Sequence, residues 1–194
     1  MIMRAQRSPG FTLLELMIAV AILAVLAALA APSLSDFFDR HRVRAAADDV
    51  SSLISHARAE SVKHDLPITI AMNGSGTAWC VGANEATPPT GGAPAGESAA
   101  CDCTQDTQCM VAGIRQVVSS GEYRGVAIGA LPSDFRFDNT LGAIVTTGGL
   151  LGSRQVTLTS PSGKYDVVVE VETLGQARSC TPSSRPAMSG MPQC

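Results

Sequence analysis

The stretch GFTLLELMIAVAILAVLAALAAP, residues 10–32, decides the architecture of this 194-residue chain. Residues 11–31 are apolar except for Thr12 and Glu15. At a helical rise of about 1.5 Å per residue, this run spans about 30 Å, the thickness of a hydrocarbon core. Two arginines and no acid precede it, which favours a cytoplasmic N-terminus. We therefore predict one transmembrane helix over residues 11–31, with residues 32–194 on the side of the membrane opposite the N-terminus.

Glu15 is the unusual residue of this segment, because a carboxylate inside a bilayer costs about 3 kcal/mol on insertion scales and is usually paired. A cut between Gly10 and Phe11 would create an amine about one helical turn before Glu15, and the carboxylate of a neighbouring subunit could neutralise it. The alternative is that Glu15 lies near the interface and reaches water. A secretory signal peptide is a second interpretation, since AALAAP imitates a cleavage site, but it leaves Glu15 unexplained.

Residues 32–65 are predicted to continue the helix in amphipathic form. Pro32 is expected to break or weaken the helix, because proline lacks a backbone N–H. Beyond it, apolar residues recur at the i, i+3, i+4 and i+7 spacing of a helix with one buried face. The expected inward face consists of Val43, Ala46, Ala47, Val50, Leu53, Ile54, Ala57 and Val62. We predict one long helix from Phe11 to about His64, ended by Leu66–Pro67.

Residues 66–194 are predicted to form a β-rich globular domain. The pair PITIAM and TAWCVGA flanks NGSG, a strong hairpin signal, and RQVTLTS and KYDVVVEVET flank PSG. Further strand-like runs cover residues 110–118, 125–130 and 134–137. Residues 84–109 are predicted to form a long loop, mobile in its Pro/Gly-rich half. The tail after Cys180 is rich in Ser and Pro, and Cys194 is its only expected anchor.

An even number of cysteines in an apparently exported domain indicates disulfides and an oxidising compartment. The six are Cys80, Cys101, Cys103, Cys109, Cys180 and Cys194. They allow fifteen full pairings, so the connectivity stays open, although Cys180 and Cys194 would close one short C-terminal loop. Thiolate ligation of a metal by Cys101, Cys103 and Cys109 is the alternative, but no CxxC pair or nearby histidine completes a zinc pattern.

Catalytic motifs are absent from the sequence. It contains no GxxxxGK[ST], GxSxG or HExxH stretch, and its three histidines are interpreted as surface residues of the helix. We therefore expect neither an enzyme nor a bound cofactor or metal. The net charge of −3 provides no global attraction to nucleic acid.

The segment over residues 10–32 resembles the prepilin motif of type IV pilins and type II secretion pseudopilins. The resemblance implies that prepilin peptidase removes the leader, residues 1–10, after Gly10 and then methylates Phe11. Glu15, the fifth residue after the cut, matches the family's glutamate that guides subunits into the growing filament. Pro32 matches a helix-weakening proline found in many pilins.

The β-rich half resembles the GspH/FimT group of minor pilins. The similar features are a tryptophan-bearing strand around Trp79, FRFDNTLGAIVTTGG, RQVTLTS, and LGQARSC followed by Cys194. The implied fold is α+β and type IV pilin-like, with a long N-terminal helix packed on antiparallel β-sheets. The implied function is that of a minor pilin that helps initiate pilus assembly at the tip or in a priming complex.

The resemblance also implies partners and a location. The partners are other minor pilins, the major pilin, prepilin peptidase and the inner-membrane assembly platform. The location is the bacterial inner membrane, crossed once, with a periplasmic C-terminal domain that is incorporated into a pilus or pseudopilus.

Three alternatives stay open at this point. The first is a GspH-like pseudopilin of a type II secretion system, against which the six cysteines weigh. The second is a FimT-like DNA-uptake pilin, whose family motif places two arginines after a glycine. Here Gln176 replaces the first arginine, so Arg178 remains, with Arg185 and Lys164 as further candidates for weak, salt-sensitive binding. The third is a membrane-anchored periplasmic domain that joins no filament.

Overall fold

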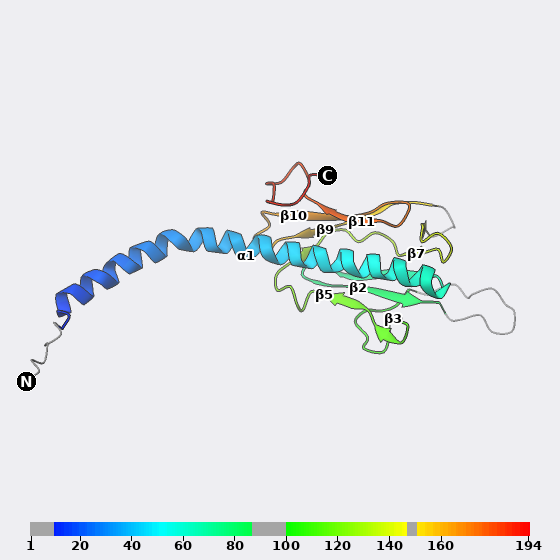
Figure 1. Ribbon diagram of the computed structural model, residues 1–194, viewed down its shortest axis with the longest axis horizontal. Helices are drawn as coiled ribbons and strands as arrows, with labels where there is room; N and C mark the ends of the chain where they lie inside the picture. The colour runs from blue at the N-terminus through cyan, green and yellow to red at the C-terminus, as the bar shows by residue number, and fades with distance from the viewer. Residues whose placement is uncertain (1–9, 87–99, 147–150) are drawn as a thin grey trace, which may run out of the picture. The chain divides into compact units, whose positions relative to one another are not determined.

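The computed structural model describes residues 10–86, 100–146 and 151–194 (Figure 1). The chain divides into two compact units, residues 1–38 and residues 39–194. Most of the predicted leader and most of the Pro/Gly-rich half of the predicted loop lie outside the described residues.

The helix α1, Leu13–His64, is close to the predicted span of Phe11 to His64. Pro32 falls inside α1 and does not divide it, which corrects the expected break. Proline removes a single i→i−4 hydrogen bond, and the turns on either side keep theirs. Local weakening of the helix at Pro32 stays a prediction.

The first unit contains the apolar part of α1. Leu13–Ala30 is long and apolar enough to cross a membrane, judged by length and composition, and none of this stretch is buried within the chain. Its large side chains are exposed on every side, as with Leu14 at 69%, Met17 at 65% and Leu23 at 64%. A helix that is apolar all round needs lipid or other helices around it.

The second unit contains antiparallel sheets, and the described strands are short. A five-stranded sheet has the order β5-β2-β1-β7-β8, a four-stranded sheet has the order β11-β10-β9-β6, and β3 pairs with β4. The bounds are β1 Ile68–Ser75, β2 Ala78–Glu85, β3 Met110–Val111, β4 Ile114–Arg115, β5 Val117–Ser119, β6 Ala127–Ile128, β7 Phe135–Phe137, β8 Ile144–Thr146, β9 Arg154–Thr159, β10 Asp166–Val171 and β11 Ala177–Cys180. A long N-terminal helix followed by antiparallel sheets is the predicted fold.

Both predicted hairpins form. β1 pairs with β2 from Ile68↔Glu85 to Ser75↔Ala78, and β9 pairs with β10 from Thr159↔Asp166 to Arg154↔Val171. The expected strand over residues 110–118 is wrong, because the chain turns there between three short strands. Ala112 and Gly113 both have positive φ, at 49° and 74°, a conformation that a continuous strand does not contain.

One hydrophobic cluster joins α1 to both large sheets. Seven of the eight predicted inward residues of α1 are buried in it, with exposures of 7% or less. Val62 is the exception and is 47% exposed, since it belongs to the last turns of α1. From β2, the indole of Trp79 stacks on Tyr123 with 6.3 Å between ring centroids, and the Tyr123 hydroxyl donates to the Asp49 carboxylate of α1.

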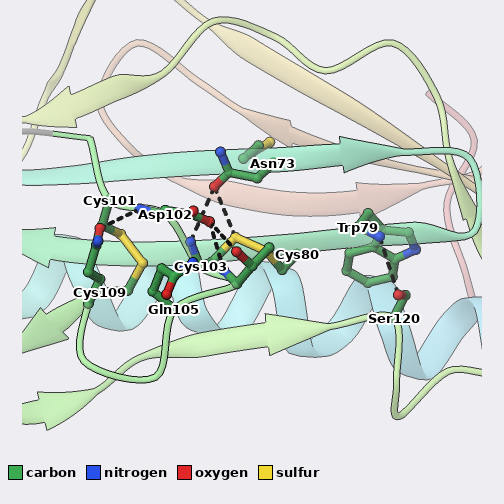
Figure 2. Close-up of a disulfide and its surroundings, with 12 residues drawn as sticks. Asn73, Trp79, Cys80, Cys101, Asp102, Cys103, Gln105, Cys109 and Ser120 are labelled. Atoms are coloured by element: carbon green, nitrogen blue, oxygen red, sulfur yellow. Dashed lines mark hydrogen bonds between the residues drawn. A yellow bond between two sulfur atoms is a disulfide. The ribbon is translucent and has the colours of Figure 1, made fainter.

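Two disulfides form a second, smaller cluster beside β2 (Figure 2). Cys80 bonds to Cys103, and Cys101 bonds to Cys109. The Cys103 amide donates to the Asn73 side-chain oxygen of β1 at 3.3 Å, so residues 101–109 are held against the sheet. Because Cys80 belongs to β2, its bond to Cys103 attaches residues 101–109 to the five-stranded sheet, and the Cys101–Cys109 bond closes that segment on itself.

The C-terminal tail is held at more points than expected. Cys180 bonds to Cys194, the pair suggested by the sequence. In addition, Arg185 forms a 2.7 Å ion pair with Asp166, and Met188 is buried in the main cluster at 5% exposure. The expectation that Cys194 alone anchors the tail is therefore wrong.

Candidate functional site

The N-terminal end of α1 is the first candidate site. Glu15 lies in the first helical turn, and its backbone N–H donates to the hydroxyl oxygen of Thr12 at 3.2 Å. Thr12 therefore occupies the N-cap, where Ser and Thr satisfy an N–H group that has no partner within the helix. The negative charge of Glu15 also lies at the positive end of the helix dipole. Gly10 and Phe11 precede the cap outside the helix, and Phe11 is 86% exposed.

Thr12 is a residue that the sequence analysis did not assign to this site. The signal was present, because Thr12 and Glu15 have the S/T-x-x-E spacing of a capping box. The observed cap uses the backbone N–H of Glu15 rather than its carboxylate. In a membrane the cap is valuable, since an unpaired backbone N–H in hydrocarbon costs several kcal/mol.

The apolar surface behind this cap has no partner among the described residues of the first unit. Glu15 is the one acid between Phe11 and Ser35. The surface can therefore make nonpolar contacts along its length and a single charged contact near its N-terminal end. That combination suits a helix that joins a bundle in a defined register.

Arg178, the second candidate site, is paired with carboxylates. Its Nη2 lies 3.0 Å from Glu170 Oε2, and its Nη1 lies 3.3 Å from Glu172 Oε1. The register of the sheet explains the first contact, because Glu170 of β10 is directly opposite Arg178 of β11. Two carboxylates therefore offset the positive charge of Arg178, the one arginine of the glycine–arginine motif that this chain retains.

Arg185 and Lys164 lie together in the structure, on a different part of the sheet from the Arg178 pairs. Arg185 Nη1 donates to the carbonyl of Gly163 at 3.0 Å, next to Lys164. Lys164 Nζ is 5.4 Å from the centre of the Tyr165 ring. The three predicted DNA-binding residues therefore do not form one group. Arg178 is paired with Glu170, whereas Arg185 and Lys164 lie at the turn over residues 160–164.

One group with the spacing of metal ligands occurs among the described residues, namely Glu170, Cys180 and Cys194. The two sulfur atoms are bonded to each other, so they do not offer thiolates. A neighbouring depression of about 440 Å³ is lined mainly by charged and amide side chains of β9, β10 and β11. Arg178 with Glu170 and Glu172 occupies its wall.

Comparisons with known proteins identify the family of this chain. The prokaryotic N-terminal methylation motif matches residues 6–31, and the family described as type II transport protein GspH matches residues 46–175. Two fimbrial proteins of Pseudomonas aeruginosa are each 38% identical over 85 residues, which are 44% of this chain and 53% of theirs. The chain thus spans about half the length of the curated relatives it matches.

A solved structure of the P. aeruginosa type IV minor pilin FimU is similar with a TM-score of 0.44 and 14% identity, over 79% of this chain and 97% of that one. The family assignment rests on the sequence matches. The methylation motif covers the exposed apolar helix with its Thr12 cap and Glu15, and the family match covers well over half of the chain, from α1 to the turn before β11. The chain therefore belongs to the GspH family of type IV pilin-like proteins.

Proposed function

We propose that this chain is a minor pilin of a type IV pilus, a structural subunit that helps to initiate pilus assembly. The observation that carries the proposal is the exposed apolar helix Leu13–Ala30 with Glu15 in its first turn. The methylation motif over residues 6–31 and the fimbrial proteins of P. aeruginosa support it. The partners are other minor pilins, the major pilin, prepilin peptidase and the inner-membrane assembly platform.

Each residue of the N-terminal segment has a role in this proposal. Prepilin peptidase cuts between Gly10 and Phe11 and methylates the new amine of Phe11. Thr12 caps the helix, and the Glu15 carboxylate neutralises the Phe11 amine of an adjoining subunit inside the membrane. Pairing removes the cost of an isolated charge in lipid, so the pair favours one axial register between neighbouring helices.

A GspH-like minor pseudopilin of a type II secretion system is the second candidate. The description of the matched family as a type II transport protein favours it. The two candidates share the helix and its processing, and they differ in the filament that the subunit enters.

DNA uptake is less well supported. Arg178 is engaged by Glu170 and Glu172, and phosphate affinity scales with the number of uncompensated positive contacts. A gel shift with the full chain in detergent across a salt series tests this point. A gel shift at low salt that is lost in Arg178→Ala would support DNA binding by this chain.

Processing and assembly are tested together in a host that makes pili or pseudopili. The expected species in sheared filaments has an N-methylated Phe11 at its N-terminus by mass spectrometry. An intact Met1, or a cut after Ala31, would contradict the proposal. Recovery of the chain with pilus components or with secretion-system components separates the first candidate from the second.

A further inference from the structure

Three segments that are distant in sequence meet at one end of the second unit. This end contains residues 39–44 of α1, the first residues of that unit. The Ser162 amide donates to Asp39 Oδ2 at 3.2 Å, which joins the β9–β10 turn to α1. Arg44 Nη1 donates to the carbonyl of Ser189 at 3.1 Å, which joins the tail to α1. Arg185 Nη1 donates to the Gly163 carbonyl, which joins the tail to the turn. Residues 39–44, 160–164 and 185–190 therefore form one surface.

This surface is rich in basic side chains, and we call it the basic end. Its five cations are Arg40, Arg42, Arg44, Lys164 and Arg185. Arg40 and Lys164 both approach the ring of the buried Tyr165, at 5.7 Å and 5.4 Å from its centre. The other three cations are exposed, as is Lys164.

The acids at the basic end are fewer. Asp39, Asp48 and Asp166 contact the three segments, and Asp36 lies one helical turn before Arg40 in α1. The basic end thus has five cations beside four acids, whereas the whole chain has 14 Lys and Arg against 17 Asp and Glu. The Arg44–Asp48 contact is 3.7 Å long and exposed, so it neutralises little in water. The fold thus concentrates positive charge at this end, because Lys164 and Arg185 come from the C-terminal third of the sequence and lie beside the arginines of α1.

We propose that the basic end binds the anionic phospholipid headgroups of the membrane that holds α1. Arg40 is ten residues beyond Ala30, the last residue of the candidate span, and ten residues of helix cover about 15 Å. Headgroups extend about 5–7 Å beyond the hydrocarbon, and charge acts over a further Debye length of about 8 Å. Measured along α1, Arg40 therefore lies at the limit of the electrostatic reach of the headgroups.

Phosphate could also come from DNA, but the tether favours lipid. A bilayer around the helix presents headgroups to the domain at a permanently high effective concentration, whereas DNA must arrive from solution. Each basic residue close to an anionic surface strengthens binding by roughly fivefold. The inference rests on the proposed membrane anchoring, and it gives the domain a preferred contact with the membrane before assembly.

A photo-crosslinking experiment with the full chain tests this inference. Ser184 is exposed next to Arg185, and Ser184→benzoylphenylalanine places a photoreactive group at the basic end. The protein is reconstituted into vesicles of phosphatidylcholine alone or of phosphatidylcholine with phosphatidylglycerol, and flotation of the protein with the vesicles verifies the anchor. We expect crosslinks to phosphatidylglycerol that weaken at high salt, and a loss of about tenfold or more in R42Q/K164Q.

The matched control is K63Q/R115Q, which removes the same two charge types elsewhere. Lys63 lies in the last turn of α1, about 30 Å along the helix from Arg42, and Arg115 lies in β4. This control should crosslink as the wild type does. Equal crosslinking in both vesicle types, equal losses in both double variants, or preferential crosslinking to added duplex DNA would overturn the inference. Protein that fails to float with the vesicles would instead contradict the membrane anchor itself.

Discussion

The hydroxyl oxygen of Thr12 lies 3.2 Å from the backbone nitrogen of Glu15 and caps the helix that carries this acid. An N-cap contributes about 1 kcal/mol, so Thr12→Val should increase amide exchange at Glu15 and Leu16 by roughly fivefold, whereas Thr12→Ser should not. Hydrogen exchange of the full chain in detergent micelles measures this effect. Equal exchange in Thr12→Val and the wild type would show that the hydroxyl does not cap the helix.

Gly175 is predicted to be intolerant of a side chain. A Cβ on Gly175 would lie 2.2 Å from the Gly142 carbonyl oxygen and 2.8 Å from Arg58, and its φ is 77°. Gly175→Ala should lower the free energy of unfolding by about 3 kcal/mol, since strain at positive φ and overpacking each cost about 1–3 kcal/mol.

Gly163→Ala is the control for this substitution, because φ is 71° there and a Cβ would meet nothing within 4 Å. It carries the backbone strain without the clash. Denaturant unfolding of both variants should show the larger loss for Gly175→Ala. Equal losses would mean that the close approach of Gly175 to Gly142 contributes nothing.

The disulfide between Cys180 and Cys194 should stabilise the tail. It joins residues 14 apart, and a loop of that length contributes about 3 kcal/mol in the chain-entropy treatment. C180A/C194A should lose about that free energy of unfolding and become sensitive to protease after Cys180. The Arg185–Asp166 ion pair and buried Met188 should retain part of the tail contacts. An unchanged stability would show that these contacts suffice alone.

Tyr123 should make stability depend on alkaline pH. Burial, and then the hydrogen bond to Asp49, raises the pKa of Tyr123 above its ordinary value of 10. The unfolded chain therefore loses this proton at a lower pH than the folded chain does. The stabilisation is complete below pH 10 and is lost as pH rises toward the folded pKa, with a slope of up to about 1.4 kcal/mol per pH unit.

The difference between the wild type and Tyr123→Phe isolates this contribution, because other groups also titrate in that range. The difference in unfolding free energy should shrink as pH rises above about 10. A difference that is constant from neutral to alkaline pH would contradict the raised pKa.

Local signals in the sequence predicted much of the fold. The apolar run, the amphipathic spacing up to His64 and the NGSG turn gave α1 and the β1–β2 hairpin closely. The division of residues 110–118 was missed, although Gly113 offers a turn signal inside this run. Ala112 also has positive φ there, and alanine carries no turn signal of its own.

The site was predicted less evenly. The processing role of Gly10 and Phe11 and the assembly role of Glu15 stay predictions. The state of Arg178 depended on which residue faces it across the sheet. That residue is Glu170, and the pairing of β10 with β11 is a tertiary fact that periodicity alone does not determine. The pairing of Cys80 with Cys103 also required the fold, since six cysteines permit many connectivities.

The central claim is that Glu15 directs this chain into a filament through the amine of Phe11 on an adjoining subunit. The most direct measurement is the amount of Glu15→Leu and Glu15→Asp protein in sheared filaments, relative to processed protein in the membrane. We expect normal processing of both variants, a loss of about tenfold or more in incorporation for Glu15→Leu, and partial retention for Glu15→Asp, because an unpaired amine in lipid costs several kcal/mol. Wild-type incorporation of Glu15→Leu would contradict the account.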